Sequence, residues 1–297
     1  MNRFRFLVFA PLLAALAFAG CAPQEPKLPP RTRAEVLSIM DQRAASLKTL
    51  RAKLSLDVKL GDMSSAQNFS ASFAASGPSS IRLHARHPLV DYDPIDLGCD
   101  GSTWWVYLHY QDTNRVDYGR LVDLERTASD VPLRPDQVVA ILGMTPLRDN
   151  PPISNWVFTV YPGHYLLQEI VRADGTRFVA TRITVDGDTN LITRYETLFP
   201  SGRTDMMATL DHYRTVNGFP IASNVHVRLL GRKHENRLDF AFSDVQVNPT
   251  LPAGIFNPLD FNSIPQRFVH PLPSVPPQAS LSGSSDLSLN SIVKVPR

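Results

Sequence analysis

The stretch that decides the fold is residues 32–60, TRAEVLSIMDQRAASLKTLRAKLSLDVKL, in which the apolar period changes once. Thr32 and Glu35 have the spacing of a capping box, which predicts the start of a helix. Apolar residues then recur near the helical period, at Val36, Ile39, Met40, Ala44, Leu47 and Leu50. From Leu50 the period becomes two, with an apolar row at Leu50, Ala52, Leu54, Leu56, Val58 and Leu60. The stretch therefore predicts one helix that leads directly into a long, half-buried strand.

The chain then continues as a series of hairpins. Turn signals at Gly61-Asp62 and Gly77-Pro78 enclose a second alternating row at Phe69, Ala71, Phe73 and Ala75. Further strands are predicted at 81–86, 95–99, 104–110, 155–161, 165–172, 178–186, 191–199, 205–214, 221–230 and 237–247. About a dozen successive antiparallel strands behind one helix favour a strongly curved sheet whose inner face needs a cover.

The alternation stops between residues 127 and 152. Pro135 suits the first turn of a helix and Gly143 suits its end, so a short middle helix is predicted over 135–142. The predicted fold class is α+β with β dominant: a strongly curved antiparallel sheet covered by the N-terminal helix and this short helix.

The N-terminus has the pattern of an export signal. Arg3 and Arg5 precede an apolar run over 6–18, which is too short for a comfortable membrane span. Ala19 and Gly20 before Cys21 resemble the lipobox of lipoprotein signal peptidase, which implies cleavage and lipidation at Cys21. Because Ala follows the cysteine, the resemblance implies a lipid-anchored protein on the periplasmic side of the outer membrane. The alternative is an ordinary secretory signal with an incidental cysteine.

Composition sets the domain boundaries. The predicted segments are a signal peptide at 1–20, a lipidated tether at 21–31, one folded domain at 32–261 and a disordered Pro/Ser-rich tail at 262–297. The domain is long enough for a sizeable core. The net charge of +2, with no basic run, predicts that nucleic acid is not a partner.

Catalytic and metal-binding patterns are weak. Cys99 is predicted to be buried on the apolar side of a strand, with a reactive thiol as the alternative. His84, His87, Asp91 and Asp93 could be imagined as metal ligands, but a strand places His84 and His87 on opposite faces. The sequence contains no recognised catalytic motif, so it predicts a protein that is not an enzyme and holds no cofactor or metal.

Three stretches resemble the LolA and LolB carriers, which move lipoproteins across the periplasm and place them in the outer membrane. The first is the helix that runs into the alternating strand. The second is HPLV at 87–90 followed by DGSTWWVY at 100–107, and the third is FSDVQVNP at 242–249 with Leu251-Pro252. The likeness covers roughly residues 33–261, and it implies a half-closed β-barrel with a helical lid and a cavity for acyl chains.

The resemblance also implies site residues. The residues expected to line the acyl cavity are Leu54, Leu56, Phe69, Phe73, Trp105 and Tyr107. The same side chains could instead fill a solid core. Leu89 matches the leucine of a membrane-facing loop in LolB-like proteins, with Val90 beside it. The alternative is that both fold back onto the barrel rim.

Two functions follow. The first is a membrane-anchored protein that takes lipid acyl chains or lipoproteins from a soluble periplasmic carrier and places them in the outer membrane, to which the Cys21 lipid tethers it. The second is a non-enzymatic structural or assembly lipoprotein of the envelope, with a filled barrel and a surface that binds protein or glycan.

Overall fold

The computed structural model describes residues 30–59, 61, 65–86, 95–110, 113–124, 133–147, 154–173, 175–230, 236–258, 260 and 269–271. The helices are α2 Arg33–Ser46, α3 Leu121–Leu124 and α4 Pro135–Ile141. The strands are β1 Thr49–Lys59, β2 Gln67–Ser76, β3 Ser80–Arg86, β4 Ile95–Asp100, β5 Thr103–Tyr110, β6 Thr113–Arg120, β7 Ser154–Tyr161, β8 His164–Ala173, β9 Thr176–Asp186, β10 Ile192–Leu198, β11 Thr204–Val216, β12 Phe219–Leu229, β13 Asn236–Val247 and β14 Val269–Pro271. The predicted β-dominant α+β class is confirmed.

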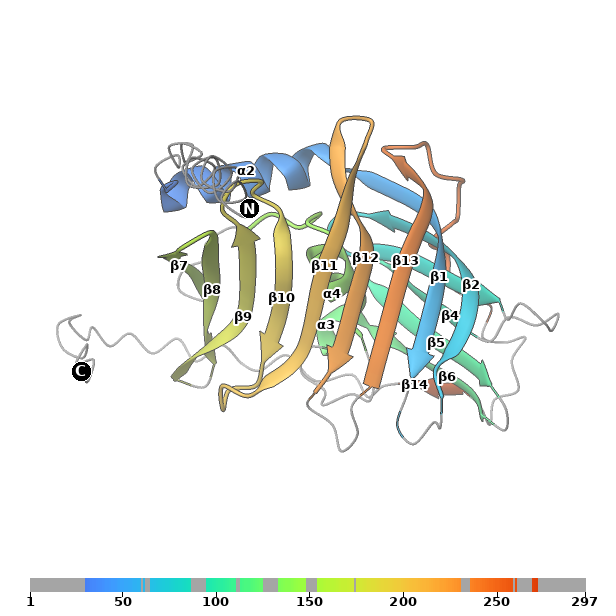
Figure 1. Cartoon of the computed structure of the whole chain (residues 1–297). Helices are drawn as coiled ribbons and strands as arrows, with labels where there is room; N and C mark the ends of the chain where they lie inside the picture. Colours follow the sequence, from blue (N-terminus) through green and yellow to red (C-terminus); the bar gives the residue numbers. More distant parts are fainter. Residues whose placement is uncertain are drawn as a thin grey trace, which may run out of the picture.

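The fourteen strands of the described residues belong to one sheet, in the order β14-β6-β5-β4-β3-β2-β1-β13-β12-β11-β10-β9-β8-β7. Strand β1 pairs with β13, for example Leu56 opposite Phe240, so the first and last long strands lie side by side. This pairing joins a wing of β1–β6 to a wing of β7–β13. The terminal strands β7 and β14 do not pair with each other, so the sheet is strongly curved but not closed (Figure 1).

Helix α2 forms because its N-terminus is capped as the sequence predicts. The Thr32 side chain accepts a hydrogen bond from the Glu35 amide, and the Glu35 carboxylate accepts one from the Thr32 amide at 2.7 Å. Val36, Met40 and Ala44 form its buried stripe. The helix lies across one end of the sheet (Figure 1).

Side-chain contacts hold α2 to two well-separated strands of the second wing, β7 and β12. Arg33 donates to the carbonyl of Trp156 in β7 at 3.1 Å, and Arg43 donates to the carbonyl of Pro220 in β12 at 2.7 Å. The Asp41 carboxylate accepts a bond from the Leu147 amide behind α4 at 2.8 Å. Helix α2 therefore ties together elements that are distant in the sequence.

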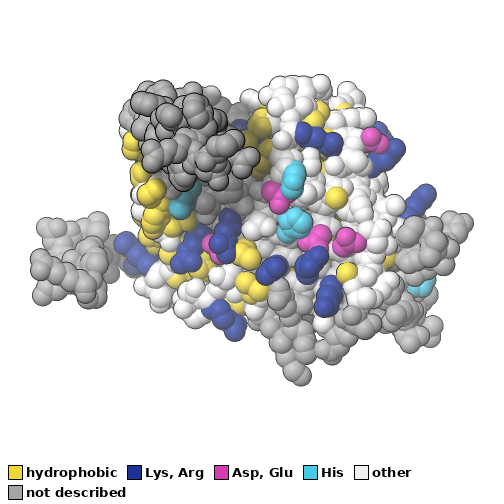
Figure 2. Space-filling view, viewed as in Figure 1, with side chains coloured by type: hydrophobic (Ala, Val, Ile, Leu, Met, Phe, Trp, Pro, Cys, Tyr) yellow, Lys and Arg dark blue, Asp and Glu magenta, His cyan; other side chains and the backbone are white. Residues whose placement is uncertain are grey.

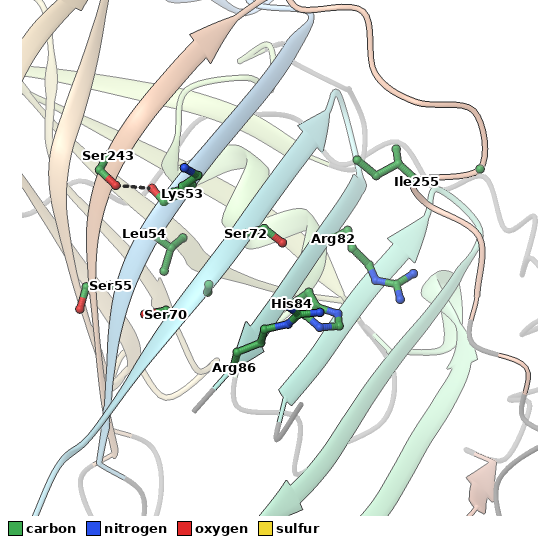
Figure 3. A pocket seen from close by; sticks show the side chains of 12 residues that line it. Lys53, Leu54, Ser55, Ser70, Ser72, Arg82, His84, Arg86, Ser243 and Ile255 are labelled. Atoms are coloured by element: carbon green, nitrogen blue, oxygen red, sulfur yellow. Dashed lines mark hydrogen bonds between the residues drawn. The ribbon is translucent and has the colours of Figure 1, made fainter. Parts of the chain in front are cut away.

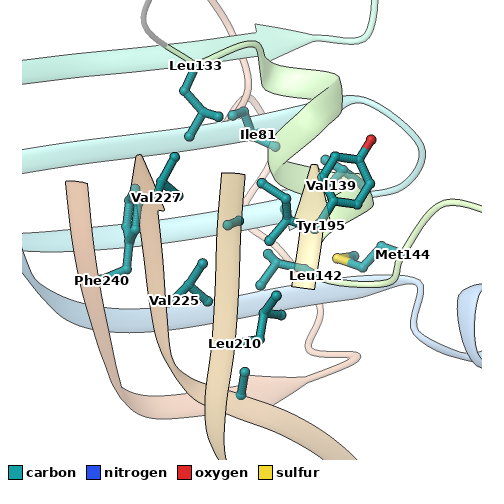
Figure 4. Close-up of a cluster of buried hydrophobic side chains, with 14 of the residues drawn as sticks. Ile81, Leu133, Val139, Leu142, Met144, Tyr195, Leu210, Val225, Val227 and Phe240 are labelled. Atoms are coloured by element: carbon teal, nitrogen blue, oxygen red, sulfur yellow. The ribbon is translucent and has the colours of Figure 1, made fainter. Parts of the chain in front are cut away.

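Helix α4 lies in the space that the curved sheet encloses (Figure 1). Figure 4 shows Val139 and Leu142 of this segment among side chains from the second wing, including Leu210 and Val225. Both α4-segment residues are buried, and they belong to the same core cluster as the inner residues of the strands. Helix α4 therefore packs against the inner side chains of the sheet.

Three elements are not foreseen by the sequence pattern. Strand β6 has charged and small residues at most positions, and Val116 is its one fully buried aliphatic residue. Helix α3 has four residues, too few for a periodic signal. Strand β14 lies within the segment predicted to be disordered, and it pairs in parallel with β6.

Candidate functional site

The inner face of the first wing meets β13 and the α4 segment around a small apolar cavity. Its volume is about 70 Å³, and every side chain that lines it is apolar. The lining consists of Leu56, Val58, Phe73, Ile81, Leu83, Ile95, Leu97, Val106, Leu108, Leu133, Val138, Leu238 and Phe240. Strand pairing aligns these rows, because Leu83 lies opposite Leu97 and Leu97 lies opposite Val106.

The described residues leave a second, smaller void beside this cavity. A neighbouring void of about 20 Å³ shares Phe73, Leu133, Val138 and Phe240 with the larger cavity. Phe73 meets Phe242 edge to face, with ring centroids 5.7 Å apart. Pockets that hold small molecules usually measure about 300 Å³ or more. The cavity as it stands is therefore smaller than an acyl-chain site.

Four of the predicted cavity residues face the interior. Leu56 and Phe73 line the cavity, whereas Leu54 and Phe69 are buried on the same side of their strands without lining it. The cavity residues contributed by α4 and the segment before it, Leu133 and Val138, were not foreseen. The spacing of apolar residues predicts a short helix here, but it does not show which strands that helix contacts.

Trp105 and Tyr107 lie elsewhere, which corrects the expected lining. In β5 they alternate with Val106 and Leu108, and the latter pair faces the cavity. Trp105 lies opposite Gly98 on the outer face, where its indole nitrogen donates to Asp96 at 3.1 Å. Because Trp104 and Trp105 are adjacent, each face of β5 carries a tryptophan, and the sequence alone did not show which of the two faces is the inner one.

The other predicted site residues, Cys21, Leu89 and Val90, lie outside the described residues. Arg86 and Ile95, the residues on either side of the 87–94 segment, are described. Ile95, which begins β4, lines the cavity, lies opposite Leu108 and pairs on its other side with Ala85.

Cys99 is a buried structural thiol. It is fully buried in the core cluster, and the Gly101 amide donates to its sulfur at 3.4 Å. Burial raises the pKa of the thiol to about 11, so almost none of it is the nucleophilic thiolate at neutral pH. Across the described part of the chain, no three His, Cys, Asp or Glu side chains gather as a metal-binding group.

A second concavity lies on the outer face of the same strands, and it was not predicted. It measures about 860 Å³, which makes it much larger than the inner cavity (Figure 3). We call it the outer groove. Its lining consists of Lys53, Leu54, Ser55, Ser70, Ala71, Ser72, Arg82, His84, Arg86, Ser243, Gly254 and Ile255.

A buried carboxylate organises one side of the outer groove. The Asp96 side chain is 4% exposed and accepts hydrogen bonds from Arg82 at 2.5 Å and from Trp105. The His84 ring nitrogen lies 3.4 Å from the same carboxylate. Burial opposes ionisation, but the bonds from His84, Arg82 and Trp105 outweigh it and lower the pKa of Asp96 below its ordinary value.

The outer face of the second wing has a different character. Figure 2 shows charged and histidine side chains spread over its middle, while apolar side chains gather toward the β7 end. His226 bridges two carboxylates there, with Asp239 at 2.7 Å and Asp211 at 3.5 Å. Val157, Val160 and Tyr161 in β7 are exposed. No described helix has the length and hydropathy that a membrane span requires.

The fold and the inner cavity define a class: an open antiparallel half-barrel whose apolar interior is covered by helices. No protein-family profile and no curated protein matches the sequence. Solved structures do match. A LolA superfamily protein from Nitrosomonas europaea superposes with a TM-score of 0.51 at 12% identity, covering 77% of this chain and 98% of that chain.

Two further structures agree. A domain from Vibrio parahaemolyticus, provisionally named as an outer membrane lipoprotein-sorting domain, gives a TM-score of 0.51 at 11% identity and covers 75% of this chain and 95% of that chain. A DUF1329 family protein from Desulfovibrio piger gives 0.52 at 13% identity, with the same coverage. The chain therefore has the LolA-like fold.

Proposed function

We propose that this protein is a lipid- or lipoprotein-binding protein of the cell envelope that accepts acyl chains in its apolar half-barrel. The observation that carries the proposal is the inner cavity, whose thirteen lining residues are all apolar. The LolA-like fold supports it. Transfer of each methylene group from water to such a lining contributes about 0.8 kcal/mol.

Acyl binding requires the cavity to enlarge. Leu133 and Val138 border both the 70 Å³ and the 20 Å³ voids, so outward movement of the α4 segment would merge them. Helix α4 has only seven residues, and a helix of that length is stabilised by packing rather than by its own hydrogen bonds. We therefore assign the α4 segment as the part that yields to the acyl chain.

Membrane attachment completes the proposal. The lipobox-like sequence before Cys21 would tether the protein to the outer membrane, where a soluble carrier could deliver cargo to it. A tethered protein suits the role of acceptor better than that of shuttle. The 87–94 segment, with Leu89 and Val90, would bring the cargo from the cavity to the bilayer surface.

The test is photo-crosslinking in the native envelope from a photoreactive residue at Phe73, with the adducts identified by mass spectrometry. Acylated proteins or lipids on Phe73 are the expected result. Val138→Phe fills the cavity from α4 and should abolish these adducts, whereas Val122→Phe at an exposed site should leave them unchanged. Circular dichroism confirms that both variants fold. Equal adducts in the two variants would contradict the proposal.

A second function is favoured by the small size of the inner voids. A non-enzymatic envelope scaffold with a filled barrel needs no cavity larger than those observed. It would bind protein or glycan through its outer surface, where the larger concavity lies. Crosslinking from Phe73 that yields no lipid, together with protein or glycan adducts from surface positions, would favour this function over the first.

A further inference from the structure

The outer groove exists because β2 presents small side chains to the outer face. Ser70 and Ser72 are exposed and lie opposite Arg86 and His84 of β3. On the other side, Ser55 and Lys53 of β1 lie opposite the same two serines. The groove therefore has a floor of serine hydroxyls, with Lys53 of β1 on one side and Arg86 and His84 of β3 on the other (Figure 3).

One wall of the groove is a regular row of basic groups. Arg82, His84 and Arg86 alternate along β3 with the inner residues Leu83 and Ala85. Side chains two residues apart on a strand repeat about every 6.6 Å. Alternate side chains of an extended peptide repeat at the same distance, so a peptide lying along β2 would keep acidic side chains in step with this row.

The basic row is held in place from below. Asp96 fixes Arg82 and His84, the Arg82 guanidinium stacks over the Trp105 ring at 5.2 Å, and Arg82 also donates to the Asn257 carbonyl at 2.8 Å. Lys53 on the facing wall pairs with Asp244 at 3.1 Å, but both side chains are largely exposed. Such a surface pair is weak and can exchange for another carboxylate.

The side chains that line the outer groove indicate which class of ligand it can bind. Among the described residues, the lining contains four basic residues and four serines. The carboxylates that pair with Arg82, His84 and Lys53, which are Asp96 and Asp244, lie outside the lining, and the lining has no aromatic side chain. Trp105 is fully buried and offers no ring for stacking on a sugar or a base. Serine hydroxyls can donate to and accept from a peptide backbone, and basic groups bind carboxylates.

We propose that the outer groove binds an extended acidic peptide segment of a partner protein, with Asp or Glu at alternate positions. The carboxylates face Arg82, His84 and Arg86, and the peptide backbone lies over Ser70 and Ser72. This site is on the opposite face of the sheet from the acyl cavity. It goes beyond the proposed lipid-handling function and does not depend on it.

The test is fluorescence anisotropy of the full chain with a rhodamine-labelled peptide of four Asp-Ser repeats at low ionic strength. Saturable binding that weakens with added salt is expected. A peptide with the four Asp residues in one block, at equal charge, should bind several-fold more weakly. A peptide with Asn in place of Asp should not bind.

Matched variants locate the site. The double variant Lys53→Gln/Arg86→Gln should raise Kd about tenfold. The double variant Lys48→Gln/Lys59→Gln removes the same charge from β1 and its flank outside the groove, and should change Kd less than twofold. Equal loss in both doubles, or equal binding of the block and alternating peptides, would overturn the proposal.

Two further readouts complete the test. Vesicles of anionic phospholipid should not displace the peptide, and displacement that depends on Lys53 and Arg86 would overturn the proposal in favour of a membrane contact. Crosslinking of lipid from Phe73, measured on the Lys53→Gln/Arg86→Gln protein, should be unchanged. Failure of the groove and failure of the acyl cavity are thereby distinguished.

Discussion

The two faces of strands β1–β4 are built from alternate residues of the same chain, yet they have opposite characters. On β2, Phe69 and Phe73 point into the buried apolar interior, whereas Ser70 and Ser72 point into the open outer groove. The inner face is covered by the α4 segment, which leaves a cavity of about 70 Å³. The outer groove measures about 860 Å³. Alternation along a pleated strand places apolar side chains on one face and polar side chains on the other. The volume of each concavity depends instead on what covers that face.

The largest expected effect tests this contrast on neighbouring residues. Phe73→Ala removes a side chain that is 2% exposed and packed against Phe242, so the free energy of unfolding should fall by about 3–5 kcal/mol. Ser72→Ala, one residue away on the outer face, should change it by less than about 0.5 kcal/mol. Urea denaturation measures both. Similar losses would mean that the two faces do not differ in packing as the structure shows.

Asp96 is an exception to this contrast, because its carboxylate is buried although it belongs to the polar outer face. Asp96→Asn removes the anion that Arg82 and His84 surround, and should cost about 2–4 kcal/mol at neutral pH. The folded pKa is lower than the ordinary one, so this stabilisation is present above about pH 4 and is lost as the pH falls through the folded pKa. Denaturation at a series of pH values should show the difference between native and variant shrinking in acid. A difference that stays constant down to pH 2 would contradict the assignment.

Gly98 lies at a position where the outer face is packed as closely as the inner face, so it tests whether close packing there also contributes to stability. An added Cβ at this position would lie 2.0 Å from the Trp105 ring, so Gly98→Ala should cost about 1–3 kcal/mol. In a Trp105→Leu background the same substitution should cost clearly less, because the clashing ring is absent. A double-mutant cycle by urea denaturation measures this coupling. Identical costs in the two backgrounds would show that Trp105 does not fill this space.

The last prediction concerns the Cys99 thiol, whose ionisation should have the smallest effect on the free energy of unfolding but a large effect on the rate of alkylation. With a pKa of about 11, its thiolate fraction at pH 8 is about 100-fold below that of an ordinary thiol, so alkylation should be slow until the protein unfolds. Because the folded pKa is raised, its contribution to stability is complete below the ordinary thiol pKa and declines as the pH rises through about 11. Iodoacetamide labelling with and without urea gives the measurement. Rapid labelling of the native protein would place Cys99 nearer the surface.

Local patterns were sufficient for most of the fold. The capping box at Thr32 and the alternation from Leu50 predicted α2 and β1, and the turn signals predicted all of the long strands except β6. Strand β6 was missed because Val116 is its one fully buried aliphatic residue, so the strand has no apolar row for a periodicity argument to detect. Strand β14 was missed because three residues form no pattern; its pairing with β6 places it.

The candidate site was less predictable. Leu56 and Phe73 were found because their strands have one clear apolar phase. Trp105 and Tyr107 were placed on the inner face because aromatic residues occupy both phases of β5, and the register Gly98 opposite Trp105 assigns that ring to the outer face. The outer groove could not be predicted from the sequence, because serine and arginine residues on a strand are also typical of an ordinary solvent-exposed surface.

The sequence by itself determined α2 and most of the long strands, the β-dominant class, the burial of Cys99 and the likeness to LolA-like proteins, because each depends on patterns within short stretches of the chain. Tertiary structure alone decided that α4 packs inside the half-barrel, that the inner cavity measures about 70 Å³, and that Arg82 and His84 meet Asp96 beside Trp105. These features join residues from different strands and helices. Their spacing is set by sheet register and curvature, which no local period encodes.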